Sequence, residues 1–456
     1  MATDGRSDQG WPPARLIPVV GIRSTEEQEK RATSSLLAVM RAVPEFGHAL
    51  VTPLGAPKGR IRTYAEIQLK DSAGKTHIPD GAIVVERGKT TWRCLVEVKT
   101  SAAQLQAEQV GRYLDMAREH GFDAVLTISN QITSAVKHSP VEVDRRRLRN
   151  LDLYHLSWWR VLTEAIVQHR HRGVSDPDQA WILGELIAYL DDERSGASGF
   201  QDMGENWVKV RNGAGDGTLR ASDPEVRDVA GRWDQFVDYL CLGLGQDLGR
   251  DVRPVRPRNQ DYVGRLDATA AALAEQGVLT AAIRVPDAVG PLTVEADLRA
   301  RRVVTSVSLD APADGRPVTR INWLVRQLKD APDGLVIEAS FPNVRGTTAC
   351  VLSDVRENPH ALLAADHKRP PRAFRLALSG PLGTKRGKGE KSFVRETRQQ
   401  AIAFYRDLVQ DLRSWRAAPP KLPDEPVEVP ETAAPEPPPF IADDREAGDA
   451  VAPVSE

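Results

Sequence analysis

The chain has 456 residues and a net charge of −2, and this length is enough for two or three domains of about 150 residues each. Its three cysteines, Cys94, Cys241 and Cys350, form no CxxC pair and no disulfide framework, which favours a reducing cytoplasm. No run of residues approaches the roughly 18 apolar residues of a membrane span, and no apolar signal-peptide core lies near the N-terminus. We therefore expect a cytoplasmic protein without membrane contact.

Charge is unevenly distributed along the chain. The last 36 residues, from Lys421, contain ten acidic and two basic residues, so the 420 residues before them carry a net charge of +6. A mildly basic body is compatible with nucleic-acid binding. From residue 417 onward Pro, Glu and Ala dominate, which predicts a disordered acidic tail over 417–456.

After an irregular leader over 1–20, the sequence predicts a helix that begins near Ser24, with Thr25 as its cap and acidic residues in its first turn. The apolar face of this helix, extended back toward its start, carries Glu29 and Glu26. A carboxylate on a core-facing helix surface needs a partner. Glu29, which lies deeper in the helix, is the better candidate for a functional acid; the alternative is an exposed acid of the first turn.

Residues 61–69 alternate in the manner of a half-buried strand, with Ala65, Ile67 and Leu69 on one face. Glu66 lies on the other face. It is a candidate for an additional acid of a metal site, or it belongs to a solvated strand surface.

Two β-rich runs then flank a polar turn at 86–90 that contains Gly88, which predicts a hairpin. Because side chains alternate along a strand, Glu97 and Lys99 share one face of the second run, while Val96 and Val98 face the opposite way. Asp80 opens the first run, so the hairpin brings it beside Glu97. Two carboxylates next to an amine suit a hard cation such as Mg²⁺, bound together with a substrate phosphate.

A helix is expected over 101–120, with Gln109 and Tyr113 stacked on one face and Gly121 at its end. Strands are expected over 122–129 and 151–156, and a further helix over 157–169. Strands that alternate with helices predict a mixed α/β sheet.

The ordered set Pro79-Asp80, then Glu97-Val98-Lys99, then Gln109-x-x-x-Tyr113 resembles the PD-(D/E)xK nuclease superfamily, in particular its RecB-like branch. The resemblance covers the first third of the chain. It implies a restriction-endonuclease-like mixed sheet flanked by helices, and a metal-dependent nuclease whose substrate is nucleic acid, with DNA expected.

The resemblance also implies roles for individual residues. Asp80 and Glu97 would hold one or two Mg²⁺ or Mn²⁺ ions, with the backbone carbonyl of Val98 as a further ligand and Glu29 facing the metal from the first helix. Lys99 would orient the attacking water. Gln109 would align that water or hold Lys99, and Tyr113 would contact the strand. His77 is either a further ligand or ordinary polar surface.

No catalytic set is apparent in the helical middle region. We expect strands over 303–309 and 334–341, a helix between them over 321–329, and a helix over 392–415. A homodimer is compatible with the sequence but not derivable from it. The expected divisions are an irregular leader (1–20), a nuclease-like domain (21–174), a helical region (175–260), an α+β domain of unknown role (261–416) and the acidic tail (417–456).

Basic residues gather in two segments that are candidates for phosphate contacts. The alternative is solvated surface with acids nearby. The Gly-rich second segment, residues 380–391, lacks the ending of a phosphate-binding P-loop. The candidate nucleic-acid-binding residues are Lys137, Arg145, Arg146, Arg147 and Arg149 in the first segment, and Lys385, Arg386 and Lys388 in the second.

Three functions remain open from the sequence. The first is a metal-dependent nuclease. The second is a nucleic-acid-binding module that keeps the fold but does not cut. The third is a scaffolding protein whose function lies in residues 178–416. For the site itself, the simplest alternative is a half-buried hairpin with a Glu97–Lys99 ion pair and no catalytic role.

Overall fold

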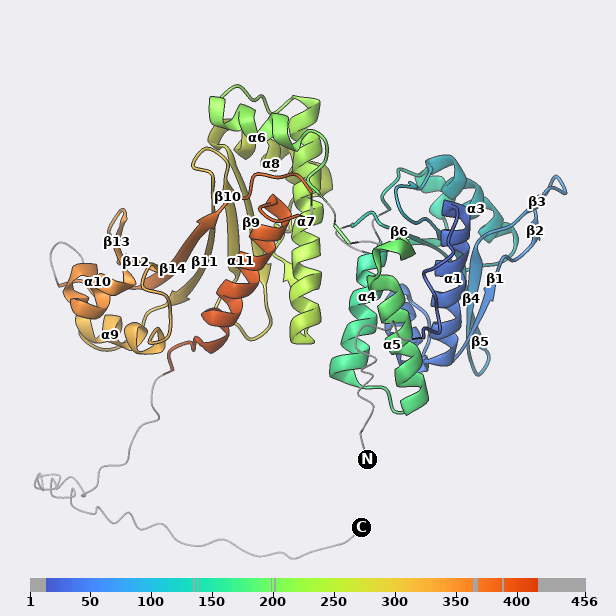
Figure 1. The fold of residues 1–456 in the computed structure, drawn as a ribbon, viewed down its shortest axis with the longest axis horizontal. Helices are drawn as coiled ribbons and strands as arrows, with labels where there is room; N and C mark the ends of the chain where they lie inside the picture. The colour runs from blue at the N-terminus through green and yellow to red at the C-terminus, as the bar shows by residue number, and fades with distance from the viewer. Residues whose placement is uncertain are drawn as a thin grey trace, which may run out of the picture. The chain divides into compact units, whose positions relative to one another are not determined.

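The first region of the fold is built on a five-stranded mixed sheet, seen in a computed structural model that describes residues 14–416 apart from 134, 135, 138, 198, 201, 364–367 and 388 (Figure 1). Its strand order is β1-β4-β5-β6-β7, with antiparallel pairing from β1 to β5 and parallel pairing from β5 to β7. The strands are β1 (Arg60–Ala65), β4 (Gly81–Arg87), β5 (Thr90–Val98), β6 (Ala124–Ser129) and β7 (Asp152–Ser157).

Helices cover both faces of this sheet. One face, which includes Val96 and Val98, forms an apolar core with four helices; the other, which includes Leu95, packs on the remaining helix, α3. Ser24, rather than the expected Thr25, caps α1 by accepting from the Glu27 N–H. The helices are α1 (Thr25–Ala42), α2 (Pro44–Val51), α4 (Trp158–Val167) and α5 (Pro177–Asp191) on the first face, and α3 (Ala107–Glu119) on the second.

The predicted hairpin is present as β4 and β5, and its turn contains Gly88 with a positive φ of 59°. In its register Gly81 lies opposite Val96. Asp80, one residue before Gly81, is therefore next to Glu97, one residue after Val96. The predicted helix start near residue 24 and the strands over 122–129 and 151–156 are also present as α1, β6 and β7.

Two expected elements differ from the structure in their extent. The strand expected over 61–69 ends at Ala65, because Glu66 has a φ of +49°, and the chain leaves the sheet into a separate small hairpin of β2 (Leu69–Lys70) and β3 (Thr76–His77). The helix expected from 101 begins only at Ala107. The preceding segment is held in a turn in which Ser101 has a φ of +53° and its N–H donates to the Gly196 carbonyl.

The second sheet has seven strands, ordered β13-β12-β14-β11-β10-β9-β8 and antiparallel throughout. The expected strands over 303–309 and 334–341 are present as β11 and β12, with a helix between them. The strands are β8 (Arg253–Pro254), β9 (Val278–Arg284), β10 (Leu292–Asp297), β11 (Arg302–Asp310), β12 (Val336–Ser340), β13 (Thr347–Val351) and β14 (Ala373–Pro381).

The helices that accompany the second sheet share one apolar core with it. The helix expected over 392–415 ends at Asp407. The helices are α6 (Trp207–Asp216), α7 (Pro224–Leu248), α8 (Tyr262–Gln276), α9 (Pro317–Gln327), α10 (Leu352–Glu357) and α11 (Phe393–Asp407).

The expected helical region over 175–260 has no core of its own. Its first helix, α5, contributes Leu183, Leu186 and Tyr189 to the core of the first sheet, whereas α6 and α7 belong to the core of the second. Helix α5 therefore packs with the first sheet although it follows the boundary expected after residue 174, and the domain division itself stays a prediction. Residues 1–13 of the leader expected over 1–20, and the tail expected over 417–456, lie outside the described residues.

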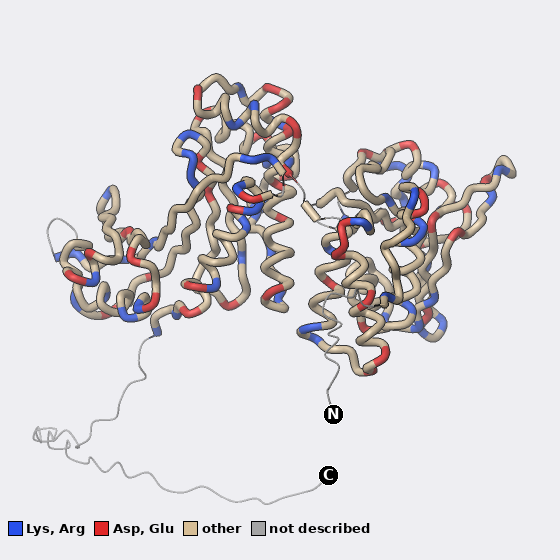
Figure 2. Tube along the Cα trace, in the orientation of Figure 1, with Lys and Arg blue, Asp and Glu red and all other residues tan. Residues whose placement is uncertain are grey.

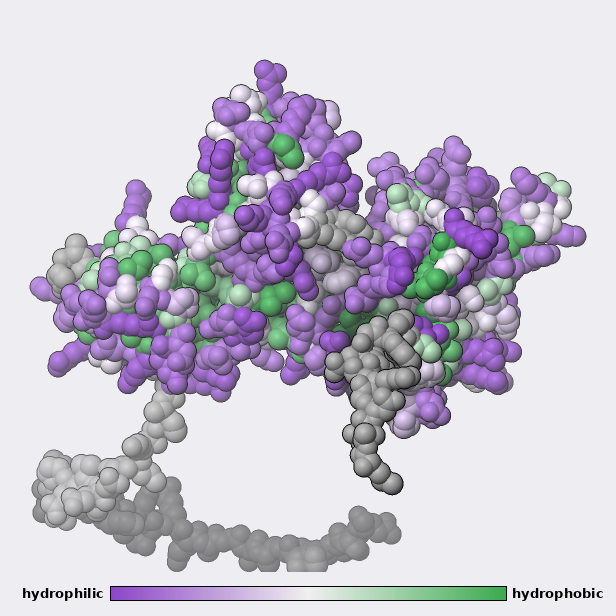
Figure 3. All heavy atoms as spheres, viewed as in Figure 1, coloured by the Kyte–Doolittle hydropathy of each residue, from purple (hydrophilic) through white to green (hydrophobic). Residues whose placement is uncertain are grey.

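The surface is largely hydrophilic in the view of Figure 3, with small apolar patches among polar residues. Acidic and basic residues are interspersed along the trace in Figure 2. No helix within the described ranges is long and apolar enough to cross a membrane.

Candidate active site

Two carboxylates meet where the β4–β5 hairpin opens. Asp80 accepts a hydrogen bond from the Val98 N–H through Oδ2, at 2.7 Å, which fixes its side chain against the end of β5. Glu97 is 1 % exposed, and the Asp80 carboxyl group is near enough to raise its pKa. The structure therefore brings these two predicted residues together, as the hairpin register indicates.

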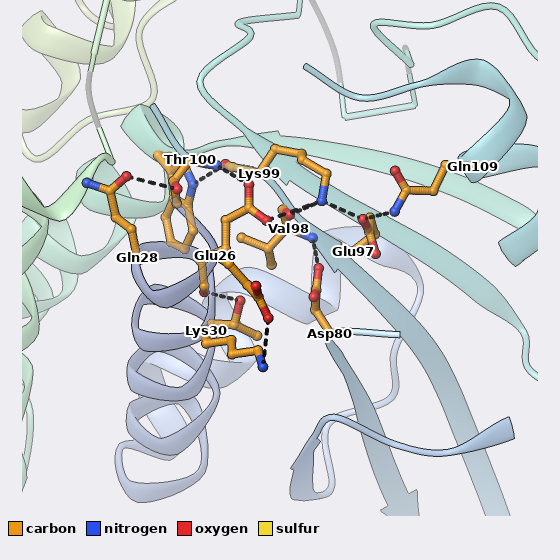
Figure 4. A network of polar contacts seen from close by, with 12 residues as sticks. Glu26, Gln28, Lys30, Asp80, Glu97, Val98, Lys99, Thr100 and Gln109 are labelled. Carbon is orange, nitrogen blue, oxygen red and sulfur yellow. Dashed lines mark hydrogen bonds and ion pairs between the residues drawn. The ribbon is translucent and has the colours of Figure 1, made fainter. Parts of the chain in front are cut away.

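Lys99 joins the end of β5 to helix α1 (Figure 4). Its Nζ lies 2.8 Å from Glu97 Oε1, 2.9 Å from the Val98 carbonyl oxygen and 3.4 Å from Glu29 Oε2. Its main chain is held on both sides, since its N–H donates to the Ile128 carbonyl and its carbonyl accepts from Trp158 Nε1. The ammonium group is thus surrounded by oxygen atoms of the same site.

The first turns of α1 bind the segment that follows β5. Glu29 Oε1 accepts from the Thr100 N–H at 3.4 Å. Gln28 Oε1 accepts from the hydroxyls of Thr100 and Ser101, at 3.2 and 2.6 Å. Glu29 therefore lies among the other candidate residues rather than as a frayed acid at the helix end, and Gln28 is a neighbour that the sequence did not single out.

Helix α3 supplies the remaining predicted residues. Gln109 Nε2 donates to Glu97 Oε1 at 2.5 Å, so this amide holds the carboxylate rather than Lys99. Tyr113, one turn later on the same face, is half-buried and interacts with both Gln109 and Glu97. Burial, followed by the nearby Glu97 charge, raises the pKa of Tyr113.

Burial and charge repulsion dominate the electrostatics of the site. Burial, and then the neighbouring Asp80 carboxylate, raises the pKa of Glu97 to about 8, although Lys99 acts in the opposite direction. Burial alone would lower the pKa of Lys99, but Glu97, Glu29 and Asp80 outweigh it and raise that pKa. Three carboxylates around one ammonium leave a surplus of negative charge when all are ionised.

The donor set fits a divalent cation. Asp80 and Glu97 present adjacent carboxylates, and the Val98 carbonyl, which already accepts from Lys99, faces the same space. Mg²⁺ and Mn²⁺ prefer such oxygen ligands and complete their shells with water and substrate oxygens. In the described part of the chain, no three side chains of Asp, Glu, His or Cys are close enough together to hold a metal ion. A cation here would therefore use two carboxylates and a carbonyl.

Glu66 does not join the site, although the sequence made it a candidate ligand. The positive φ at Glu66 turns the chain away, and its exposed carboxylate pairs with Lys30 at 3.1 Å, as does Glu26. His77 likewise pairs with Asp71, at 2.8 Å. These side chains form local surface pairs rather than a metal site.

The described basic candidates are either exposed without an ion pair or paired with an acid. Arg145, Arg146 and Arg149, on and after the short helix η2 (Arg145–Leu148), are exposed and form no ion pair with any described residue. Three further candidates form ion pairs. These are Lys137 with Asp152 at 3.3 Å, Arg147 with Asp115 at 3.5 Å and Arg386 with Asp202 at 3.2 Å. Lys385 is exposed, and Lys388 lies outside the described residues.

A second polar pair lies next to Glu97 in the sheet. Thr127 is opposite Glu97 in the β5–β6 register, and His155 is opposite Thr127 in the β6–β7 register. The Thr127 hydroxyl lies 3.0 Å from His155 Nδ1, and burial lowers the pKa of His155 to about 4. The signal for this row was visible in the sequence as polar residues within otherwise apolar buried strands.

No protein-family model matches the chain, and no curated protein has a sequence significantly similar to it.

Proposed function

We propose that this chain is a divalent-metal-dependent nuclease that hydrolyses phosphodiester bonds, with DNA as its substrate. The observation that carries the proposal is the excess of carboxylates at the end of β5. Glu97, which is almost fully buried, shares its surroundings with Asp80 and Glu29, and the ammonium of Lys99 contacts Glu97 and Glu29. Burying unbalanced charge is costly, so a purely structural pair would not need the additional carboxylates.

The arrangement of the sheet supports the same proposal. The candidate residues come from the β4–β5 hairpin and from α3 directly after it, in the order that the PD-(D/E)xK resemblance implies. The antiparallel strands β1, β4 and β5 are followed by the parallel strands β6 and β7. This mixed sheet, with helices on both faces, is compatible with a restriction-endonuclease-like domain.

Hydrolysis of a phosphodiester requires a nucleophilic water, charge relief at the phosphate and stabilisation of the leaving oxygen. A divalent cation held by Asp80, Glu97 and the Val98 carbonyl would supply charge relief and a water of lowered pKa. Gln109 fixes the orientation of the Glu97 carboxylate through its amide. Lys99 keeps a positive charge at the mouth of the site, where it attracts the phosphate.

A nucleic-acid-binding module without cleavage is the second candidate function. The exposed residues Arg145, Arg146 and Arg149 favour nucleic-acid binding in either case, because unpaired arginines can contact backbone phosphates. Cleavage, rather than binding, therefore separates the two candidates.

The test is incubation of the full-length protein with circular and linear DNA and RNA, in Mg²⁺, in Mn²⁺ and in EDTA. We expect wild type to degrade DNA only with metal, and Lys99→Ala to be inactive while remaining folded. Glu66→Gln is the matched control, because Glu66 is a nearby carboxylate whose partner is Lys30; its activity should stay close to that of wild type. Salt-sensitive binding without cleavage would favour the non-catalytic module, and neither activity would favour a scaffolding role.

A further inference from the structure

The ammonium of Lys99 takes up the oxygens that a metal ion at this site would need. Its three oxygen neighbours are Glu97 Oε1, the Val98 carbonyl oxygen and Glu29 Oε2. The first two belong to the donor set that fits a divalent cation. Two cations that shared these two oxygens would repel each other strongly in a site so little exposed to water. Lys99 and a metal ion are therefore competitors for Glu97 and the Val98 carbonyl.

Glu29 differs from the other two neighbours. Its carboxylate is anchored by the Thr100 N–H, on the segment after β5, and its other oxygen faces Lys99. Among the residues that the structure describes, Glu29, Asp80 and Glu97 do not form a group able to hold a metal together. Glu29 is therefore near enough to keep the ammonium but not arranged as a third carboxylate ligand.

We propose that Lys99 is the resident cation of the metal-free site, and that it leaves Glu97 and Val98 for Glu29 when the carboxylates take up a divalent metal. In this account Glu29 is a positioning residue that acts through Lys99, instead of the metal ligand that the superfamily resemblance implies. The inference rests on the proposed metal-dependent function. It describes how the position of Lys99 differs between the metal-free and the metal-bound site. Because Glu29 retains the Lys99 ammonium, its positive charge stays close to where the phosphate of the substrate would bind.

The experiment measures Mn²⁺ affinity of the full-length protein without nucleic acid, from the electron paramagnetic resonance signal of free Mn²⁺. The variants are Lys99→Met, Glu29→Gln and the double variant, with Lys99→Gln as a second replacement should Lys99→Met unfold. Lys30→Met is the matched control, because Lys30 is also an ammonium paired with two carboxylates, Glu26 and Glu66, but it contacts neither Glu97 nor Val98. It therefore measures the effect of removing a nearby positive charge alone.

We expect Lys99→Met to bind Mn²⁺ roughly tenfold more tightly than wild type, and Lys30→Met to change the affinity by less than about twofold. Glu29→Gln should weaken binding by about fivefold when Lys99 is present and have almost no effect in the Lys99→Met background. This dependence on the background is what a positioning residue predicts and a direct ligand does not.

Equal weakening by Glu29→Gln in both backgrounds would make Glu29 a metal ligand and overturn the inference. So would a Lys99→Met affinity no tighter than that of Lys30→Met. Both outcomes leave the nuclease proposal intact, because metal is still bound. A complete lack of Mn²⁺ binding by wild type and by every variant would overturn the proposed function and this inference together.

Discussion

The five-stranded and the seven-stranded sheet each carry a partly buried charged cluster, and the clusters differ in balance. The acid-rich cluster of the first sheet comprises Glu29, Asp80, Glu97 and Lys99. The balanced cluster, beside the second sheet, comprises Asp234, Asp238, Arg256 and Arg265. Three carboxylates share one cation in the first, whereas two carboxylates share two cations in the second. A balanced cluster compensates its own charge, whereas an acid-rich one bears the cost of carboxylates without a matching cation.

The pKa values of Asp238 and Glu97 reflect this difference in charge balance between the two clusters. Asp238 lies 2.8 Å from Arg256, and burial raises its pKa to about 6 even though Arg256 acts to lower it. Burial together with Asp80 raises the pKa of Glu97 to about 8. Asp238 is therefore ionised more readily near neutral pH than Glu97. The acid-rich cluster holds a proton there, which a divalent cation can replace.

The largest expected effect is on catalysis. Glu97→Gln keeps the shape of the side chain but removes a negative charge from the proposed metal ligands, so DNA cleavage in Mg²⁺ should fall by about 10³-fold or more. Asp238→Asn, which changes the balanced cluster in the same way, should leave cleavage per folded molecule within about threefold. Similar losses in both variants would remove the functional distinction between the clusters.

The next largest effect concerns the stability of the balanced cluster. Asp238→Ala removes the acid 2.8 Å from the partly buried Arg256, while Asp234 stays at 3.3 Å. Breaking one side of a buried charge network should lower the free energy of unfolding by about 3 kcal/mol. Urea unfolding at neutral pH measures this change, and a loss below about 1 kcal/mol would show that the cluster contributes little to folding.

For the acid-rich cluster, the change in the free energy of unfolding should have the opposite sign. Without metal, Glu97→Gln should raise the free energy of unfolding by roughly 1–2 kcal/mol at pH 8.5. The pKa of Glu97 is raised from 4.5 to about 8 in the folded protein, so wild type loses stability as the pH rises through that interval. The gain in the variant should therefore be small near pH 5. A variant that melts lower than wild type at pH 8.5 would instead indicate that Glu97 serves mainly as the ion-pair partner of Lys99.

The smallest effect is on nucleic-acid binding in EDTA. Arg146→Ala removes an exposed arginine without a described ion pair, so affinity should fall and the log–log salt slope should decrease by about one. Arg147→Ala, whose arginine pairs with Asp115, is the control and should change the slope less. Unchanged slopes in both variants would make this segment ordinary solvated surface.

The parts of the site that sequence reasoning reached depend on local rules. Strand alternation and the hairpin register are sufficient to pair Asp80 with Glu97 and to put Lys99 on the same face. Helical spacing likewise relates Gln109 to Tyr113. Because these relations involve neighbours in sequence or a single turn, no knowledge of distant residues was needed.

The parts that it missed depend on contacts between distant residues. The helix expected from 101 begins at Ala107 because Ser101 is tied to Gln28 and to Gly196. Glu66 turned out to pair with Lys30 because a positive φ redirects the chain, which alternation cannot indicate. The contact of Trp158 with the Lys99 carbonyl joins residues far apart in the sequence and had no local signal.

The most direct test of the central claim is the melting temperature of the full-length protein with and without Mn²⁺, for wild type and Glu97→Gln. If the acid-rich cluster is a metal site, Mn²⁺ at about 100 times its dissociation constant should stabilise wild type by about 2.7 kcal/mol, and Glu97→Gln far less. Before metal is added, the variant should melt higher than wild type at pH 8.5. An unchanged melting temperature for wild type in saturating Mn²⁺, with Glu97→Gln melting lower than wild type in both conditions, would contradict the account.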